Sequence, residues 1–259
     1  MRILITNDDG INAPGLEVLH EIATELAGPG GEVWTVAPAF EQSGVGHCIS
    51  YTHPMMISKM GERRYAAEGS PADCVLAGIH DVLDDKPDLI LSGVNRGNNS
   101  AENALYSGTL GGALEGALQH VTSFALSQYL GPANFHADDP FEAARVYGAD
   151  VIRKVMAAVP EDGDDYRVFY NINFPPQPAD QVQGVRVGAQ GFRRHTRFST
   201  EPHLSPSGRK FLWIRGGEQH RPTEAGTDAA LNLLGFVSVT PMRADLTAHD
   251  VLDTLKGIE

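Results

Sequence analysis

The chain has 259 residues, of which 42% are hydrophobic and 20% charged, a composition typical of a folded globular protein with an ample core. It carries 20 Lys and Arg against 33 Asp and Glu, and this net charge of −13 argues against an extended surface for nucleic acid or anionic membranes. We expect neither a signal peptide nor a membrane span, because no run of about 18 apolar residues occurs. Cys48 and Cys74 lie outside any zinc-type spacing, which favours reduced thiols and a cytoplasmic protein.

Short apolar strands alternate with helical periodicity along most of the chain. This alternation predicts an α/β fold, with a doubly wound, mostly parallel sheet and right-handed crossovers. We expect strands at 3–6, 33–37, 88–92, 123–126, 167–173 and 236–240, and a hairpin over 48–68. We expect helices at 16–26, 71–83, 108–120, 141–158 and 228–234, with loops at 38–47 and 93–107.

The texture changes after Pro175-Pro176, where the chain becomes polar and rich in Gly and Pro. Residues 177–225 contain only short strand-like pieces, at 185–187 and 211–214, so we interpret them as hairpins that leave the sheet. Residues 243–259 are interpreted as a C-terminal arm with a helical stretch near 248–258. The whole chain, residues 1–259, is taken as one domain with these two additions.

Two adjacent aspartates follow the first predicted strand, in the sequence Asn7-Asp8-Asp9-Gly10. In a regular strand their side chains would point to opposite faces, but in a turn just past the strand end both carboxylates converge. Two carboxylates this close need a cation, a shared proton or open water. At the carboxyl end of a parallel strand we favour a divalent cation over a solvated acidic turn.

Two further loops follow predicted strands and are expected at the same sheet edge. Ser43 lies in the first of them, next to Gly44, and Asn95 lies in the second, beside Arg96 and Gly97. Together with the two aspartates they supply carboxylate, hydroxyl and amide oxygens, which suit Mg²⁺, Mn²⁺ or Ca²⁺ and not a thiolate zinc site. Read singly, each loop is equally compatible with an ordinary surface loop.

A third loop, Tyr106-Ser107-Gly108-Thr109, opens a Gly-rich helix. Ser107 and Thr109 are both good cap residues, and a helix start with little side-chain bulk presents bare N–H groups that favour phosphate. The alternative is a plain helix cap with glycines for close packing. His47 is interpreted as structural or solvated more readily than as a phosphate contact.

Two common hydrolase motifs are missing from the sequence. Gly-x-x-x-x-Gly-Lys-Ser/Thr does not occur, which argues against a P-loop NTPase. Gly-x-Ser-x-Gly does not occur either, which argues against a nucleophile-elbow hydrolase.

Taken in order, the motifs resemble those of the stationary-phase survival protein SurE family. The resemblance covers roughly residues 1–125 and 165–242. Ser70 stands where the family usually has threonine, and residues 190–222 match only loosely. The stretches that carry the resemblance are Asn7-Asp8-Asp9-Gly10, Ala13-Pro14-Gly15, Ala37-Pro38, Gln42-Ser43-Gly44, Gly69-Ser70-Pro71-Ala72-Asp73-Cys74, Ser92-Gly93-Val94-Asn95, Tyr106-Ser107-Gly108-Thr109, Asn171-Ile172-Asn173, Gly226-Thr227-Asp228 and Ser238-Val239-Thr240-Pro241.

The resemblance implies a metal-dependent nucleotidase acting on nucleoside 5′- and 3′-monophosphates, with some exopolyphosphatase activity. It implies metal ligands at Asp8, Asp9, Ser43 and Asn95. It also implies phosphate contacts around Ser107, Gly108 and Thr109. The implied fold is a Rossmann-like core with a protruding hairpin region, assembled as a homodimer or homotetramer through swapped C-terminal elements.

We therefore expect a cytoplasmic phosphomonoesterase with one Mg²⁺ or Mn²⁺ per subunit, bound chiefly by Asp8 and Asp9 with help from Ser43 and Asn95. The start of the 108–120 helix and Asn99 would stabilise the developing charge on the phosphate. Because no covalent nucleophile stands out, direct attack by water is the simpler hypothesis. The rival hypothesis is a non-enzymatic nucleotide or phosphate sensor that uses the aspartates only structurally.

Overall fold

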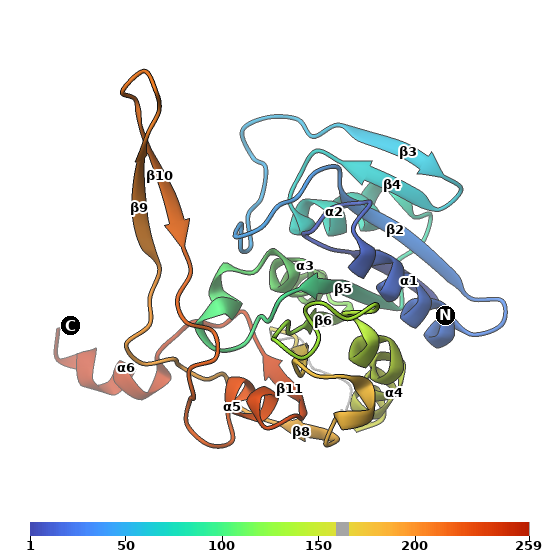
Figure 1. Cartoon of the computed structure of the whole chain (residues 1–259). Helices are drawn as coiled ribbons and strands as arrows, with labels where there is room; N and C mark the ends of the chain where they lie inside the picture. Colours follow the sequence, from blue (N-terminus) through green and yellow to red (C-terminus); the bar gives the residue numbers. More distant parts are fainter. Residues whose placement is uncertain (159–165, 259) are drawn as a thin grey trace.

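The computed structural model describes residues 1–158 and 166–258. Among these residues, nine strands form one sheet in the order β3-β4-β2-β1-β5-β6-β7-β11-β8 (Figure 1). The six strands from β4 to β7 run parallel, while β3 and β11 are antiparallel to their inner neighbours. Their bounds are β1 (Arg2–Thr6), β2 (Glu32–Pro38), β3 (Ile57–Gly61), β4 (Arg64–Ala67), β5 (Leu89–Arg96), β6 (Thr122–Gln128), β7 (Phe169–Phe174), β8 (Val185–Val187) and β11 (Val237–Met242).

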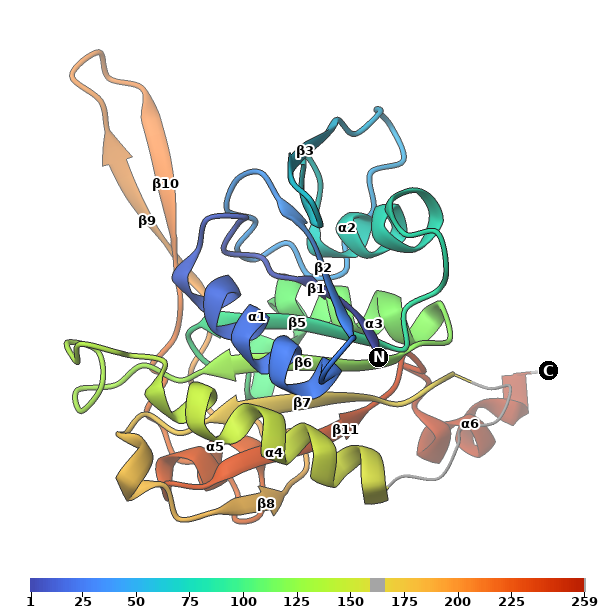
Figure 2. The same ribbon diagram turned by 90° about the vertical axis from the view of Figure 1, so that its right-hand side faces the viewer.

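Helices cover both faces of this sheet, as the predicted α/β class requires. On one face α1 and α4 lie side by side, and on the other α2 packs against α3 (Figure 2). Burial alternates along β1 accordingly, with Ile3 and Ile5 in the core under α1 and α4 and Leu4 in the core under α2. The helices are α1 (Pro14–Ala27), α2 (Pro71–Ala77), α3 (Gly108–Leu118), α4 (Glu142–Ala158), α5 (Asp228–Leu233) and α6 (His249–Leu255).

The strand order reverses at β1, and this reversal positions the candidate site. The chain leaves β1 through α1 to β2 on one side, and later returns to place β5 on the other side. In open α/β sheets ligands bind outside the carboxyl ends of the strands at such a switch point. Asp8-Asp9 directly follow β1, and Asn95 lies at the carboxyl end of the neighbouring β5.

The predicted doubly wound α/β class is confirmed, and most expected elements are present within a few residues of their expected bounds. Four stretches differ in detail from what was expected. Residues 93–96 are not loop, because β5 continues to Arg96 and pairs again with β6 after a bulge. Residues 101–106 form a 3-10 helix, and of the expected 48–68 hairpin only 57–67 pairs. The helix from Pro71 ends at Ala77 and continues as a π-helix over Gly78–Val82.

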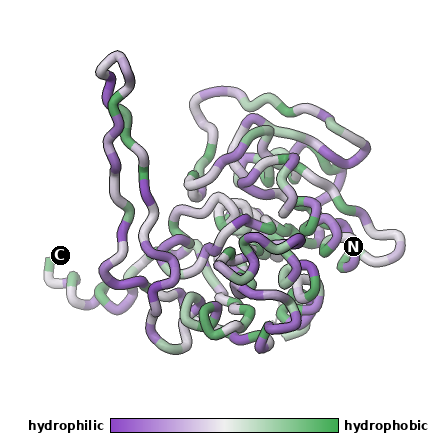
Figure 3. Tube along the Cα trace, in the orientation of Figure 1, coloured by the Kyte–Doolittle hydropathy of each residue, from purple (hydrophilic) through white to green (hydrophobic). Residues whose placement is uncertain are grey.

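The excursion after β7 divides into two parts. Residues 185–187 were expected away from the sheet. Instead they form β8, which pairs in parallel with β11 and is the edge strand of the sheet. Only β9 (Ser199–Leu204) and β10 (Lys210–Arg215) leave the sheet, as an antiparallel hairpin that projects from the body with apolar residues along β10 (Figure 3). The segment 243–258 bears α6, none of whose residues is buried, and Glu259 lies outside the described residues. In the described parts of the chain, no helix has the length and apolarity that crossing a membrane requires.

Candidate active site

Asp8 and Asp9 lie in a tight turn directly after β1, as the sequence predicted. The Asn7 amide donates to the Gly10 carbonyl at 2.9 Å, and Gly10 has a φ of 101°, a conformation that side chains rarely adopt. The turn buries Asp8, which is 4% exposed, and leaves Asp9 partly accessible. Both carboxylates line the same cavity at the switch point, so the strand end does bring them together.

The helix α3 stabilises the buried Asp8 carboxylate. Its Oδ1 accepts a hydrogen bond from the Thr109 hydroxyl at 2.6 Å. The pKa of Asp8 is raised to about 6. Burial is the main cause and the neighbouring Asp9 charge adds to it, while the hydrogen bond from Thr109 lowers the pKa in part. A carboxyl with these properties is ionised at neutral pH at a cost, and a bound cation would remove that cost.

The end of β5 holds Asp9 in place. The backbone N–H of Arg96 donates to Asp9 Oδ2 at 3.0 Å. Burial is the largest influence on this carboxyl and raises the pKa of Asp9 above its ordinary value, and the nearby Glu41 adds to the effect. The part of β5 that continues beyond the bulge therefore has a role at the site, since it carries the N–H group that contacts the aspartate.

Ser43 and Asn95 line the same cavity as the two aspartates. The Asn95 amide nitrogen donates to the Gly97 carbonyl at 2.9 Å, which fixes the side chain and leaves the amide oxygen as the remaining ligand atom. The Ser43 hydroxyl donates to Glu41 Oε1 at 2.7 Å in a partly exposed loop. Glu41 was not predicted as a site residue from the sequence. The only signal for it was its position two residues before Ser43.

The donor set fits a hard divalent cation. It consists of two carboxylates with raised pKa values and two neutral oxygens, and it has no sulfur or imidazole. Over the described ranges, no group of three or more His, Cys, Asp or Glu side chains could hold a metal. A cation at this edge would therefore depend on the neutral oxygens of Ser43 and Asn95 as well as on the aspartates.

The four residues expected to contact phosphate have different local roles. Ser107, not Thr109, caps α3, because its hydroxyl accepts from the Leu110 N–H at 3.1 Å. A side chain on Gly108 would lie 2.9 Å from Asp8 Cβ, so this glycine is required for the approach of Asp8 to the helix. The Asn99 amide donates to Ser127, so this side chain also supports the loop that follows β5.

The cavity at the switch point has a volume of about 760 Å³, within the range of small-molecule sites. Ser107 and Asn99 line it together with all four expected metal ligands. His47 is not among its lining residues and instead lies 2.7 Å from the buried Glu115 carboxylate. A neighbouring cavity of about 1010 Å³ shares only Asp9, Glu41 and Arg96 with it.

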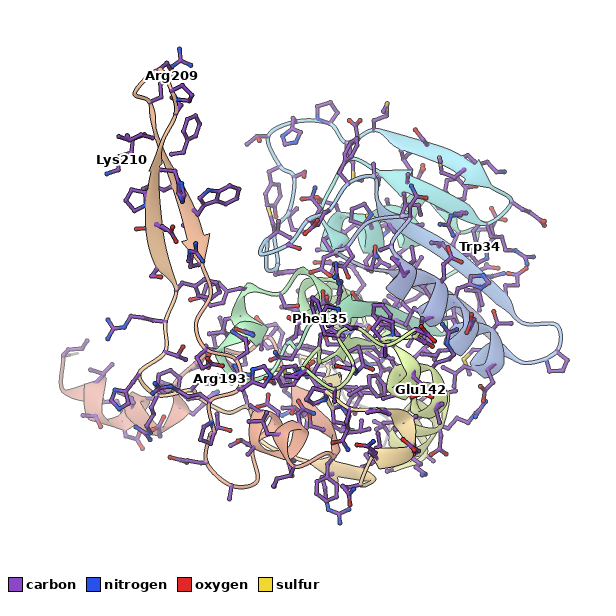
Figure 4. The ribbon with its side chains drawn as sticks, in the orientation of Figure 1. Trp34, Phe135, Glu142, Arg193, Arg209 and Lys210 are labelled. Atoms are coloured by element: carbon purple, nitrogen blue, oxygen red, sulfur yellow. The ribbon has the colours of Figure 1, made fainter. Side chains whose placement is uncertain are left out.

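Arg193, which was not predicted from the sequence, fixes the loop beneath the hairpin. Arg193 lies at the foot of the hairpin (Figure 4) and is 0% exposed. Its guanidinium joins both chain segments at that foot to the loop that follows β5. It donates to Gln219 O (3.1 Å), Ser100 O (3.1 Å), Ser100 Oγ (2.9 Å), Asn98 Oδ1 (2.9 Å) and Glu102 Oε1 (3.2 Å).

Comparison with known proteins was consistent across sequence and structure. The family model described as "Survival protein SurE" matches residues 3–197. Proteins named 5′-nucleotidase SurE from Ruegeria pomeroyi and Roseobacter denitrificans are 70% and 69% identical to this chain, covering 99% and 100% of it and 99% of each relative. The crystal structure of the SurE protein from Aquifex aeolicus superposes with a TM-score of 0.81 at 36% identity, covering 100% of this chain and 99% of that one.

We predict that Asp8→Asn stabilises the metal-free protein in a pH-dependent way. The pKa of this carboxyl is about 6 when folded and 3.8 when exposed, so folding takes up a proton between these values and stability falls as pH rises through them. Above about pH 6 the cost reaches roughly 2–3 kcal/mol, which the neutral amide avoids while keeping an oxygen for Thr109.

The measurement is urea unfolding in excess EDTA at about pH 4 and about pH 8. The variant should match the unmodified protein at the lower pH and exceed it at the higher pH. If the variant is less stable than the unmodified protein at the higher pH, ionised Asp8 does not destabilise the metal-free fold.

Replacing Arg193 should destabilise the fold strongly. Arg193→Met keeps much of the volume but leaves several buried acceptors without a donor, so we expect a loss of about 3–5 kcal/mol in urea unfolding. Arg194→Met is the matched control. Arg194 is exposed and pairs with Glu224, so its loss should cost less than about 1 kcal/mol. Equal effects of the two substitutions would show that the buried network contributes little.

Proposed function

Because the chain belongs to the SurE family, we propose that it is a divalent-metal-dependent 5′-nucleotidase that hydrolyses nucleoside 5′-monophosphates to nucleoside and phosphate. The relatives named 5′-nucleotidase SurE support the reaction class. The observation that carries the proposal is the convergence of Asp8, Asp9, Ser43 and Asn95 on one cavity next to the start of α3. We extend the proposed substrates to 3′-monophosphates and short polyphosphate, because the proposed cation and the start of α3 act on the phosphate group that all of these substrates share.

We propose that Asp8, Asp9, Ser43 and Asn95 hold one Mg²⁺ or Mn²⁺. When bound, such a cation polarises a phosphate oxygen and lowers the pKa of water at the site. The protein keeps these donors in position through Thr109, which orients Asp8, and through the Arg96 N–H, which orients Asp9. These contacts fix the carboxylates before substrate arrives.

The chain's own groups bind and orient the phosphate. The N-terminus of α3 directs its partial positive charge toward the cavity, and Ser107 and Gly108 lie at that end. Asn99 is held by Ser127 and borders the same space. With no side-chain nucleophile assigned, we propose that water attacks phosphorus in line with the leaving nucleoside oxygen.

Phosphate release from AMP tests the proposed function directly. The unmodified protein should be active with Mg²⁺ or Mn²⁺ and silent in EDTA, with zinc no better than either. Asp8→Asn and Asp9→Asn should each lower kcat/KM by about two orders of magnitude or more, because each removes one anionic ligand with little change in volume. Full activity after exhaustive chelation would rule out the metal. Nucleotide binding without hydrolysis would favour the rival sensor hypothesis.

We also propose that the protein is a homodimer or homotetramer in the cytoplasm. The motivation is apolar surface on two projecting elements: Phe211, Leu212, Trp213 and Ile214 of β10 are all more than half exposed. On α6 no residue is buried, although Val251, Leu252 and Leu255 are apolar. Isolated hairpins and exposed apolar patches of this kind are usually covered by a partner.

Removing residues 243–259 should shift the protein toward smaller species in light scattering at micromolar concentration. The truncation leaves the sheet complete, because β11 ends at Met242. Thermal stabilisation by Mn²⁺ should therefore persist in the truncated protein. A monomeric full-length protein would contradict the proposed assembly.

A further inference from the structure

The candidate cavity has two chemically different ends. One end holds the carboxylates, the amides and the start of α3. The other end is apolar and comes from three separate parts of the chain: the 3-10 helix before α3, the loop after β6, and the projecting hairpin with its approach. Its lining residues are Tyr106, Leu130, Phe135, Phe198 and Ile214. Hence the segment 177–225, expected to leave the sheet as hairpins, also contributes side chains to the cavity.

Tyr106 and Phe198 contact each other in this apolar lining. Their ring centroids lie 4.6 Å apart with an interplanar angle of 59°. Tyr106 is 47% and Phe198 41% exposed, so both retain accessible ring surface. Tyr106 directly precedes Ser107, the cap of α3, so the aromatic surface adjoins the proposed phosphate position. An aromatic pair left open beside an anion site is suited to a flat ring attached to a phosphate.

The amide side chains that line the cavity next to this apolar end are largely engaged with one another. Gln219 Oε1 accepts from Asn103 Nδ2 at 2.5 Å and from Asn98 Nδ2 at 3.3 Å. Gln219 Nε2 in turn donates to the Gly217 carbonyl, and Asn98 Oδ1 accepts from Arg193. With these groups committed, ring stacking is the main interaction that this end of the cavity offers to a ligand.

The neighbouring cavity is a poorer place for the nucleoside. It contains Asp9 but lacks Asp8, Ser43, Asn95 and Ser107. Asp9, Glu41 and Arg96 line both cavities, so they lie between a phosphate at the start of α3 and the neighbouring cavity. The aromatic end of the first cavity is closer to such a phosphate, because Ser107 and the adjacent Tyr106 line the same space.

We propose that Tyr106 and Phe198 form a stacking platform for the nucleobase of the substrate. The proposal rests on the proposed nucleotidase function and assigns the part of the site that distinguishes nucleotides from simple sugar phosphates. Stacking of a base on an aromatic side chain is strong and tolerant of base identity, because every base has a π-face. We therefore expect the platform to favour substrates that carry a base, with little preference among the bases.

The test compares two substrates and one binding ligand. Tyr106→Ala and Phe198→Ala should each lower kcat/KM for AMP roughly tenfold or more, while kcat/KM for ribose 5-phosphate changes less than about twofold. Each should weaken binding of adenosine, measured by calorimetry, by a similar factor. Tyr106→Phe and Phe198→Tyr should restore both properties, because they keep the ring. Phe211→Ala, on the same hairpin but outside the cavity, should change neither.

Three results would overturn the platform. Equal losses with AMP and ribose 5-phosphate would show that the rings only support the fold. Unchanged adenosine binding in both alanine variants would place the base elsewhere. A loss of AMP affinity in Phe40→Ala instead would place it in the neighbouring cavity, which Phe40 lines. If no substrate is hydrolysed, the proposed function fails, yet adenosine binding still decides on the platform.

Discussion

A buried carboxylate beside a second carboxylate is the constraint around which the site is built. Asp8 is almost fully enclosed, and its ionised form depends on the Thr109 hydroxyl and on the start of α3. Gly108 must lack a side chain for that approach, and the Arg96 N–H must reach Asp9. These contacts join the turn after β1 to two other segments, α3 and the end of β5. The arrangement therefore holds negative charge in position before any cation binds, at a cost in stability.

The sheet topology explains why so few residues suffice. Because the order reverses at β1, the turn after β1 and the end of β5 face each other with no strand between them, and α3 then begins beside both. The turn after β1, the loop after β2 and the end of β5, which are far apart in the sequence, thereby supply the whole proposed oxygen set. The bulge in β5 matters for the same reason, since a strand that ended at Ser92 would stop short of Asp9.

The features that the sequence predicted are those with local causes. The acidic turn, the helix that starts after Tyr106 and the alternation of strands and helices all follow from short-range patterns. Long-range pairing was not predictable: three β8 residues join the sheet because β11, some fifty residues later, lies alongside them. Arg193 was missed for the same reason, since its acceptor Asn98 is separated from it by 95 residues. The sequence also could not show which of Ser107 and Thr109 caps α3. The Thr109 hydroxyl is bound to Asp8, and Ser107 is the cap.

The foot and the tip of the hairpin serve different purposes. At the foot, Arg193 joins Gln219 to Ser100, and the buried Asp228 accepts hydrogen bonds from the Ala101 and Gly191 N–H groups. These bonds fix the segment to the loop that follows β5. Farther out, β9 and β10 pair only with each other and keep their apolar side chains exposed. The foot is therefore fixed to the body of the protein, while the tip keeps apolar surface that a partner could cover.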